Sequence, residues 1–213
     1  LDKKLHFAVL ERTDKVTFIE KVFDFLLKKH NLAELSINRY VFAEKLAELI
    51  NLRLEEHSKK KFDAALKKKS VGIVAGTAFP DTILLKQPVR REFNKNLYER
   101  IDPLNGEESE FVDRLDLDKL PNLEFWVRNR EKVDPFYIQG WRKGKFYPDF
   151  IAVSRKGHTA ALEWKGEDRI SNDDTKYKVE IGNLWASLGK GKLHFFLVNN
   201  GNIEETLNTL KEL

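Results

Sequence analysis

The chain of 213 residues contains no cysteine and no methionine. Without cysteine it has no disulfides, zinc fingers, thiolate-bound clusters or cysteine nucleophiles. This composition is typical of a reducing compartment, so we expect a cytoplasmic location. The lack of an initiator methionine indicates either a fragment of a longer protein or a sequence from which modified methionines have been left out.

Two further features are missing. No apolar run approaches the roughly 18 residues of a membrane-spanning helix, and the start lacks the apolar stretch of a signal peptide. We therefore expect no membrane partner. The nucleotide-binding loop G-x-x-x-x-G-K-[ST] is also missing, because Gly144-Lys145 and Gly191-Lys192 do not fit its spacing. The chain is thus expected to lack an ATP-driven motor.

Apolar and charged residues are both plentiful. Hydrophobic residues make up 41% of the chain and aromatic residues 11%, which is enough to bury a core. Charged residues make up 34%, and 38 lysines and arginines against 34 acidic residues leave a net charge of +4. Such a balance permits a polyanionic partner without requiring one.

The pattern of residues changes near position 80. Before it, apolar residues at three- and four-residue spacing predict helices over residues 13–27, closed by Asn31, and about 36–57. After it, we expect strands at 82–85, 89–93, 123–127, 146–153, 159–165 and 193–198, and helices at 107–116, 175–188 and 203–213. The chain therefore divides into a helical segment, residues 1–79, and an α/β domain, residues 80–213, with a mixed central sheet flanked by helices.

Three charged residues stand on the hairpin expected between positions 146 and 165. Glu163 and Lys165 belong to the only Glu-x-Lys of the chain, and residues two apart on a strand share a face. A three-residue loop ending at Gly157 places Asp149 opposite Glu163. A two-residue turn would instead place Asp149 on the face of the hairpin opposite to that of Glu163. We choose the longer loop, because its third position favours a left-handed residue such as glycine.

Two carboxylates and an ammonium on one buried face are unfavourable unless something compensates their charge. Mg²⁺ is the natural compensation, since it prefers oxygen ligands and commonly takes one or two carboxylates together with a substrate phosphate. Such an ion lowers the pKa of a bound water. Lys165 beside it would orient or deprotonate the attacking water.

The simpler alternative is a hairpin on the surface. A solvated Glu–Lys pair contributes almost nothing to stability, and the chain would then be a helical interaction module with an unrelated α/β domain. That alternative requires Glu163 to be exposed. The apolar runs on both strands of the hairpin favour a position inside a sheet.

Two segments of the hairpin, KFYPDFI at 145–151 and ALEWKG at 161–166, resemble the PD-(D/E)XK nuclease superfamily. More closely, the chain is similar to the C-terminal endonuclease domain of the restriction subunit of type III restriction-modification enzymes. In that family further segments recur in the same order, here NGEESEFVDRLD at 105–116, FWVRN at 125–129 and DDTKYKVEIGNLW at 173–185. The resemblance covers about residue 105 to the C-terminus and implies a restriction-endonuclease-like fold.

The resemblance also implies roles for individual residues of the hairpin. Asp149 and Glu163 would be metal ligands, and Lys165 would be the catalytic lysine. The backbone carbonyl of Trp164 would complete the metal site.

A helical glutamate that faces the metal or its waters is implied as well. Glu108 fits best, because Phe111 supplies the aromatic residue three positions on, but Glu107 and Glu110 remain open alternatives. For each of the three glutamates taken singly, an acid of a first helical turn stabilised by the helix dipole is the simpler interpretation.

The implied function is that of a Mg²⁺-dependent endodeoxyribonuclease that hydrolyses double-stranded DNA, with Mn²⁺ able to replace Mg²⁺. In the family, ATP serves a helicase-like motor, and a DNA-methyltransferase (modification) subunit chooses the site while phosphate contacts position the duplex. Both are expected partners, and the motor is expected to lie in a missing part of the same chain. Lys176 and Lys178, on the helix after the hairpin, are equally consistent with phosphate contact and with a solvated face.

Two alternatives keep the fold and change the function. The chain could be a stand-alone repair or junction nuclease of the same superfamily. It could also be a catalytically silent nuclease-like module that binds DNA or a protein, although such a module has no need to keep Asp149, Glu163 and Lys165.

Overall fold

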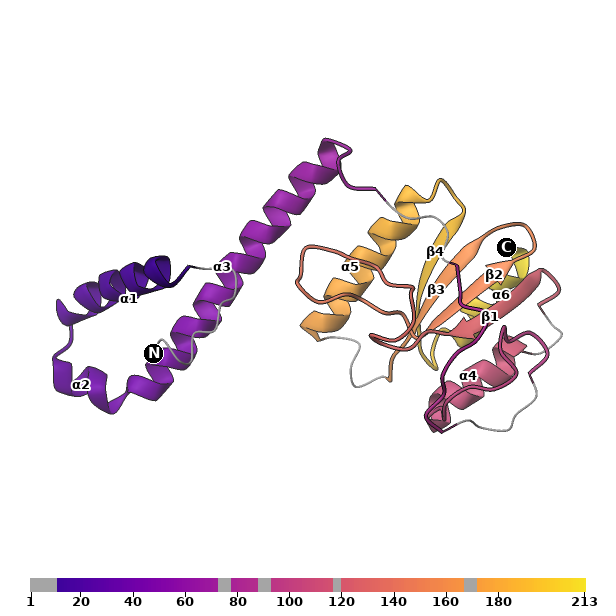
Figure 1. The fold of residues 1–213 in the computed structure, drawn as a ribbon, viewed down its shortest axis with the longest axis horizontal. Helices are drawn as coiled ribbons and strands as arrows, with labels where there is room; N and C mark the ends of the chain where they lie inside the picture. The colour runs from indigo at the N-terminus through magenta and orange to yellow at the C-terminus, as the bar shows by residue number, and fades with distance from the viewer. Residues whose placement is uncertain (1–10, 73–77, 88–92, 117–119, 167–171) are drawn as a thin grey trace. The chain divides into compact units, whose positions relative to one another are not determined.

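The computed structural model describes residues 11–72, 78–87, 93–116, 120–166 and 172–213. It divides into two compact units, Leu1–Ala64 and Ala65–Leu213 (Figure 1). The division at positions 79 and 80, which marks where the predicted strands begin, stays a prediction. No helix among the described residues is both long and apolar enough to cross a membrane.

The first unit is helical. It contains α1 (Arg12–Leu27), α2 (Leu32–Ile37) and most of α3 (Arg39–Lys67). Leu46 and Ile50 of α3 form its buried centre, and Ile19 and Val22 of α1 pack against them. The helix expected over residues 13–27 is confirmed.

The second predicted helix, about 36–57, is wrong at both ends. Asn31 does not simply close α1, because its side chain caps α2 by accepting from the Glu34 amide at 2.9 Å. The helical path breaks at Asn38, and α3 then continues ten residues past His57. The lysine-rich stretch of residues 59–67 favours helix and holds no glycine or proline to end it.

The second unit is an α/β domain built on a four-stranded mixed sheet (Figure 1). Its elements are α4 (Gly106–Asp116), β1 (Leu123–Arg128), β2 (Phe150–Ser154), β3 (Thr159–Trp164), α5 (Asp173–Leu188), β4 (Leu193–Val198) and α6 (Ile203–Glu212). The strands lie in the order β1-β2-β3-β4, and only the β3–β4 pair is parallel. The expected mixed sheet flanked by helices is confirmed.

The predicted register of the hairpin is confirmed. Phe150 pairs with Leu162 and Ile151 with Ala161, which is the register of the three-residue loop. Gly157 closes that loop in a left-handed conformation, with φ +75°. Asp149 and Glu163 therefore meet at the same end of the hairpin, on strands that lie at the centre of the sheet.

One hairpin strand is shorter than expected. The predicted strand of 146–153 begins only at Phe150, because Pro148 offers no amide hydrogen to the ladder. Phe146 instead pairs with Ile138 through two backbone hydrogen bonds of 2.8 and 2.9 Å. The segment before Asp149 is thus held by a separate small bridge.

The strand expected at 82–85 is wrong. Leu84 is 89% exposed, and the segment of residues 82–85 does not form a strand. Its backbone is held by side chains instead: Asp102 accepts from the amides of Lys86 and Gln87, and Arg130 donates to the Leu84 carbonyl. Most of the strand expected at 89–93 lies outside the described residues.

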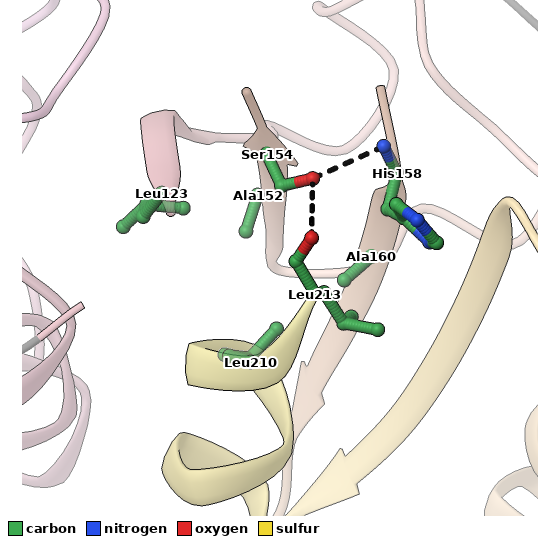
Figure 2. A pocket seen from close by; sticks show the side chains of 7 residues that line it. All are labelled: Leu123, Ala152, Ser154, His158, Ala160, Leu210 and Leu213. Carbon is green, nitrogen blue, oxygen red and sulfur yellow. Dashed lines mark hydrogen bonds between the residues drawn. The ribbon is translucent and has the colours of Figure 1, made fainter. Parts of the chain in front are cut away.

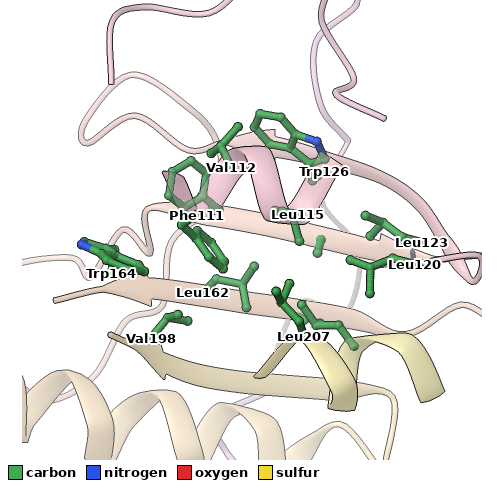
Figure 3. Close-up of a cluster of buried hydrophobic side chains, with 14 of the residues drawn as sticks. Phe111, Val112, Leu115, Leu120, Leu123, Trp126, Leu162, Trp164, Val198 and Leu207 are labelled. Carbon is green, nitrogen blue, oxygen red and sulfur yellow. The ribbon is translucent and has the colours of Figure 1, made fainter. Parts of the chain in front are cut away.

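The main core lies between the sheet and the helices α4 and α6 (Figure 3). Phe111, Val112 and Leu115 of α4 are completely buried, and Leu207 and Leu210 of α6 join them. Burying each such side chain contributes about 1.5–3 kcal/mol to folding. This packing fixes the first turn of α4 beside the end of β3.

The other face of the sheet is covered by α5. A Cβ atom added to Gly182 would lie 2.5 Å from the ring of Phe195 on β4, so only glycine allows the helix to come this close. The close approach brings the N-terminal half of α5 to the sheet face that carries Glu163.

The C-terminus is tied to the hairpin at the opposite end from Asp149. The Ser154 hydroxyl donates to the Leu213 carbonyl at 3.2 Å and accepts from the His158 amide at 3.1 Å (Figure 2). The last turn of α6 is therefore anchored over the start of β3.

Two histidines near this anchor are expected to make folding sensitive to acid. Nδ1 of His158 lies 2.9 Å from Nε2 of His194. Burial, together with Lys192 and Lys156, holds the pKa of His158 below its usual 6.5, and burial with His158 lowers that of His194. Because the folded state favours neutral rings, stability is expected to fall as pH drops below about 6.5.

Urea denaturation at pH 7.5 and pH 5 measures this loss. His194→Gln should reduce the difference between the two pH values by about 0.5 kcal/mol, a small value because both rings are partly solvated. His30→Gln is the matched control, since His30 lies on the exposed surface of the helical unit. An equal effect of both substitutions would contradict the role of the histidine pair.

Candidate active site

A cleft of about 680 Å³ opens where β2 begins, β3 ends and α4 starts. Five predicted site residues line it, namely Glu108, Asp149, Glu163, Trp164 and Lys165. The sheet thus brings together residues that are far apart in the sequence. The predicted site residues share one cavity.

Asp149 stands at the start of β2 and faces the end of β3. Its Oδ2 accepts a hydrogen bond from the Trp164 amide at 2.7 Å, which fixes the carboxylate across the hairpin. Burial and the nearby Glu163 raise the pKa of Asp149 to about 7, against the opposing hydrogen bond from Trp164. Two carboxylates this close repel each other when both are charged, so the site favours a proton or another cation.

Glu163 is the most buried charged residue of the cleft. The residue is 1% exposed, and its Oε1 accepts from Nζ of Lys165 and Nζ of Lys178, each at 2.9 Å. Its Oε2 is also buried but has no hydrogen-bond partner among the described residues. The interpretation as a solvent-facing hairpin is therefore wrong.

The two lysines differ in their surroundings. Lys165 extends from the end of β3 and is 17% exposed, whereas Lys178 reaches in from α5 and is 22% exposed. Burial lowers the pKa of Lys178, but Glu163 and Asp174 outweigh it and raise the pKa above its usual value. Two ammonium groups on one carboxylate oxygen offset much of the unfavourable burial of Glu163.

The three candidate glutamates of α4 occupy different positions. Glu108 forms a capping box with Asn105, through hydrogen bonds of 2.7 and 3.2 Å, and lies 3.6 Å from Arg128. Glu107 accepts from Nε1 of Trp164 at 3.1 Å. Glu110 is exposed and does not line the cleft. Glu108 contributes to the raised pKa of Asp149, so its charge reaches the cleft, while its role as a metal ligand stays a prediction.

The donor set fits a hard cation at Asp149 and Glu163. Within the described parts of the chain, no group of three or more histidine, cysteine or acidic side chains is arranged to hold a metal ion. One or two carboxylates suffice for Mg²⁺, which keeps several waters. The buried, unpartnered Oε2 of Glu163 is the observation that favours such an ion. The carbonyl of Trp164 as a further ligand stays a prediction.

Asn129 was not singled out from the sequence, yet it lines the cleft. The residue is 5% exposed, and its Nδ2 donates to the carbonyls of Phe136 and Pro148. The backbone amide of Asn129 also donates to the Asp149 carbonyl at 2.8 Å. Asn129 therefore positions the backbone on both sides of Asp149. An asparagine after a predicted strand carries no sequence signal for this role.

The structure separates two lysines that the sequence left equivalent. Lys178 lines the cleft and contacts Glu163, whereas the Lys176 side chain is 69% exposed and pairs with Asp173 at 3.4 Å. Of the two, only Lys178 is placed to act on a ligand in the cleft.

Comparisons of the chain with protein-family models, curated proteins and solved structures found no match.

Proposed function

We propose that the α/β unit is a divalent-metal-dependent DNA endonuclease domain with a restriction-endonuclease-like fold. The observation that carries the proposal is the arrangement of Asp149, Glu163 and Lys165 at one end of a central hairpin. The carboxylates repel each other, one buried oxygen lacks a partner among the described residues, and a lysine stands beside them. These features support a Mg²⁺ site of the kind that hydrolyses phosphodiesters.

Each residue has a distinct part in this proposal. Asp149 and Glu163 would hold the cation, which when bound supplies a positive charge for the phosphate and a more acidic water. Lys165, held by Glu163, orients the attacking water. The Trp164 amide and Asn129 keep Asp149 in place. Glu108 adds negative charge at the rim and helps to hold the cation.

The substrate we propose is double-stranded DNA, within an enzyme similar to type III restriction endonucleases. In such an enzyme an ATP-driven motor and a methyltransferase subunit would bring the nuclease to its site, so the domain itself needs only phosphate contacts. The net charge of +4 is compatible with such contacts.

Nicking of supercoiled plasmid tests the proposal. The purified chain is expected to nick DNA with Mg²⁺ or Mn²⁺ and to be inactive in EDTA. A parallel preparation of Asp149→Asn, which is expected to be inactive, shows whether a contaminating nuclease is responsible. If neither protein nicks DNA or binds metal, the cleft belongs to a silent module, and the nuclease proposal is wrong.

A further inference from the structure

The cleft contains two lysines that contact Glu163, and the proposed chemistry uses only Lys165. Lys165 and Lys178 both place Nζ 2.9 Å from the same oxygen of Glu163. A divalent ion on Glu163 would add two more positive charges to this cluster. Like charges at such short range repel strongly in a partly buried site, so binding of the metal favours the departure of one of the two ammonium groups from Glu163.

Of the two lysines, Lys178 is the one with a second carboxylate within reach. It extends from α5 rather than from the sheet, and Nζ already lies 3.4 Å from Oδ2 of Asp174, one turn earlier on the same helix. Asp174 is 61% exposed, so a move toward it brings the ammonium to the open side of the cleft. Among the described residues, Lys165 has no second carboxylate within ion-pair distance of its Nζ.

We propose that Lys178 is a phosphate-binding residue that occupies Glu163 only while the metal is absent. When the cation binds, Lys178 leaves Glu163 and contacts a DNA phosphate at the mouth of the cleft. The ligand class is a phosphodiester, and the contact is sequence-independent. This inference rests on the proposed function, because the displacing cation is the proposed metal.

The proposal predicts opposite effects on metal and on DNA, which a purely structural ion pair does not. In Lys178→Met, calorimetric titration with Mn²⁺ alone should show binding at least about fivefold tighter, because a repelling charge is gone. Affinity for a short duplex in Ca²⁺ should fall about tenfold, and the dependence of log affinity on log salt should become shallower by roughly one. Lys178→Arg should recover most of the duplex affinity.

Two further variants complete the experiment. Lys176→Met removes an exposed lysine from the same helix and should leave Mn²⁺ binding within about twofold of the parent. Asp174→Asn is a surface change that tests the same idea without removing Lys178. It should weaken Mn²⁺ binding about twofold to fivefold, since the ammonium loses the carboxylate that draws it off Glu163.

Several outcomes overturn the proposal. Weaker Mn²⁺ binding in Lys178→Met would show that the lysine supports the metal site. Unchanged duplex affinity and salt dependence would show that it does not contact phosphate. If Lys178→Met does not fold, unchanged Mn²⁺ binding in Asp174→Asn overturns the displacement. If the parent protein binds Mn²⁺ and nicks plasmid while the variants fail these tests, only the role of Lys178 is wrong. If the parent does neither, the proposed function is wrong as well.

Discussion

Asp149→Asn is expected to reduce metal-dependent nicking at least about 1,000-fold and to stabilise the metal-free protein at neutral pH. The loss of nicking follows because a neutral amide binds Mg²⁺ poorly and the metal contributes several kcal/mol to such a reaction. The fold should persist, since the asparagine oxygen can still accept the 2.7 Å hydrogen bond from the Trp164 amide.

The gain in stability follows from the raised pKa of Asp149. Asp149 has a pKa of about 7 in the folded protein, against the ordinary 3.8 expected in the unfolded chain. Such a raised pKa stabilises the folded state at low pH, where the carboxyl is protonated. That contribution is lost as pH rises from about 4 to about 7. Asparagine has no proton to lose, so at pH 8 in EDTA the variant should be more stable than the parent by about 1–3 kcal/mol.

Urea denaturation of both proteins in EDTA at pH 5 and pH 8 measures the effect. The difference in unfolding free energy between parent and variant should grow toward pH 8. Asp174→Asn on the exposed start of α5 is the control and should show no such growth. An Asp149→Asn protein that is less stable than the parent at both pH values would contradict the repulsion between Asp149 and Glu163.

Local chemistry was enough to predict the hairpin. The turn Arg155-Lys156-Gly157 fixes the register, because glycine adopts the left-handed conformation at φ +75° that the third position requires. Side-chain alternation then places Asp149 opposite Glu163. The strands of the hairpin and β4 were recognisable from their apolar runs in the same way.

Contacts between distant segments were not predictable by such means. The stretch of residues 82–85 has a strand-like composition, but Asp102 and Arg130 satisfy its neighbouring backbone groups with side chains. A sequence pattern does not show which distant carboxylate will accept from a given amide. The same holds for Asn129, whose partners Phe136 and Pro148 lie 7 and 19 residues further along the connection between β1 and β2.

The distinction between Lys176 and Lys178 was not predicted from the sequence either, because it depends on how α5 packs on the sheet. Ile181 and Trp185 of α5 are buried, and Lys178 lies one turn from Ile181 on the same side of the helix. In the structure this buried stripe turns Lys178 toward the sheet, whereas Lys176 stays exposed. The sequence could not show that Glu163 lies within reach of Lys178. Their contact depends on how closely Gly182 lets α5 approach β4.

Glu163→Gln is expected to be the most destabilising change in the cleft. The glutamine keeps the size of the side chain but leaves Lys165 and Lys178 without their shared carboxylate. Breaking a buried ion pair costs about 3–5 kcal/mol. We expect about 2–3 kcal/mol here, since both ammonium groups are partly exposed and the charge on Asp149 loses a repelling neighbour.

Chemical denaturation with and without Mg²⁺ separates this structural effect from metal binding. The parent should gain stability with Mg²⁺, whereas Glu163→Gln should not, because a metal that binds only the folded state stabilises it by mass action. Glu107→Gln is the matched control: it lines the same cleft, is exposed, and should change stability by less than about 0.5 kcal/mol. Equal stabilities of the two variants would mean that the lysines do not depend on Glu163. A Glu163→Gln protein that still gains stability with Mg²⁺ would place the cation elsewhere.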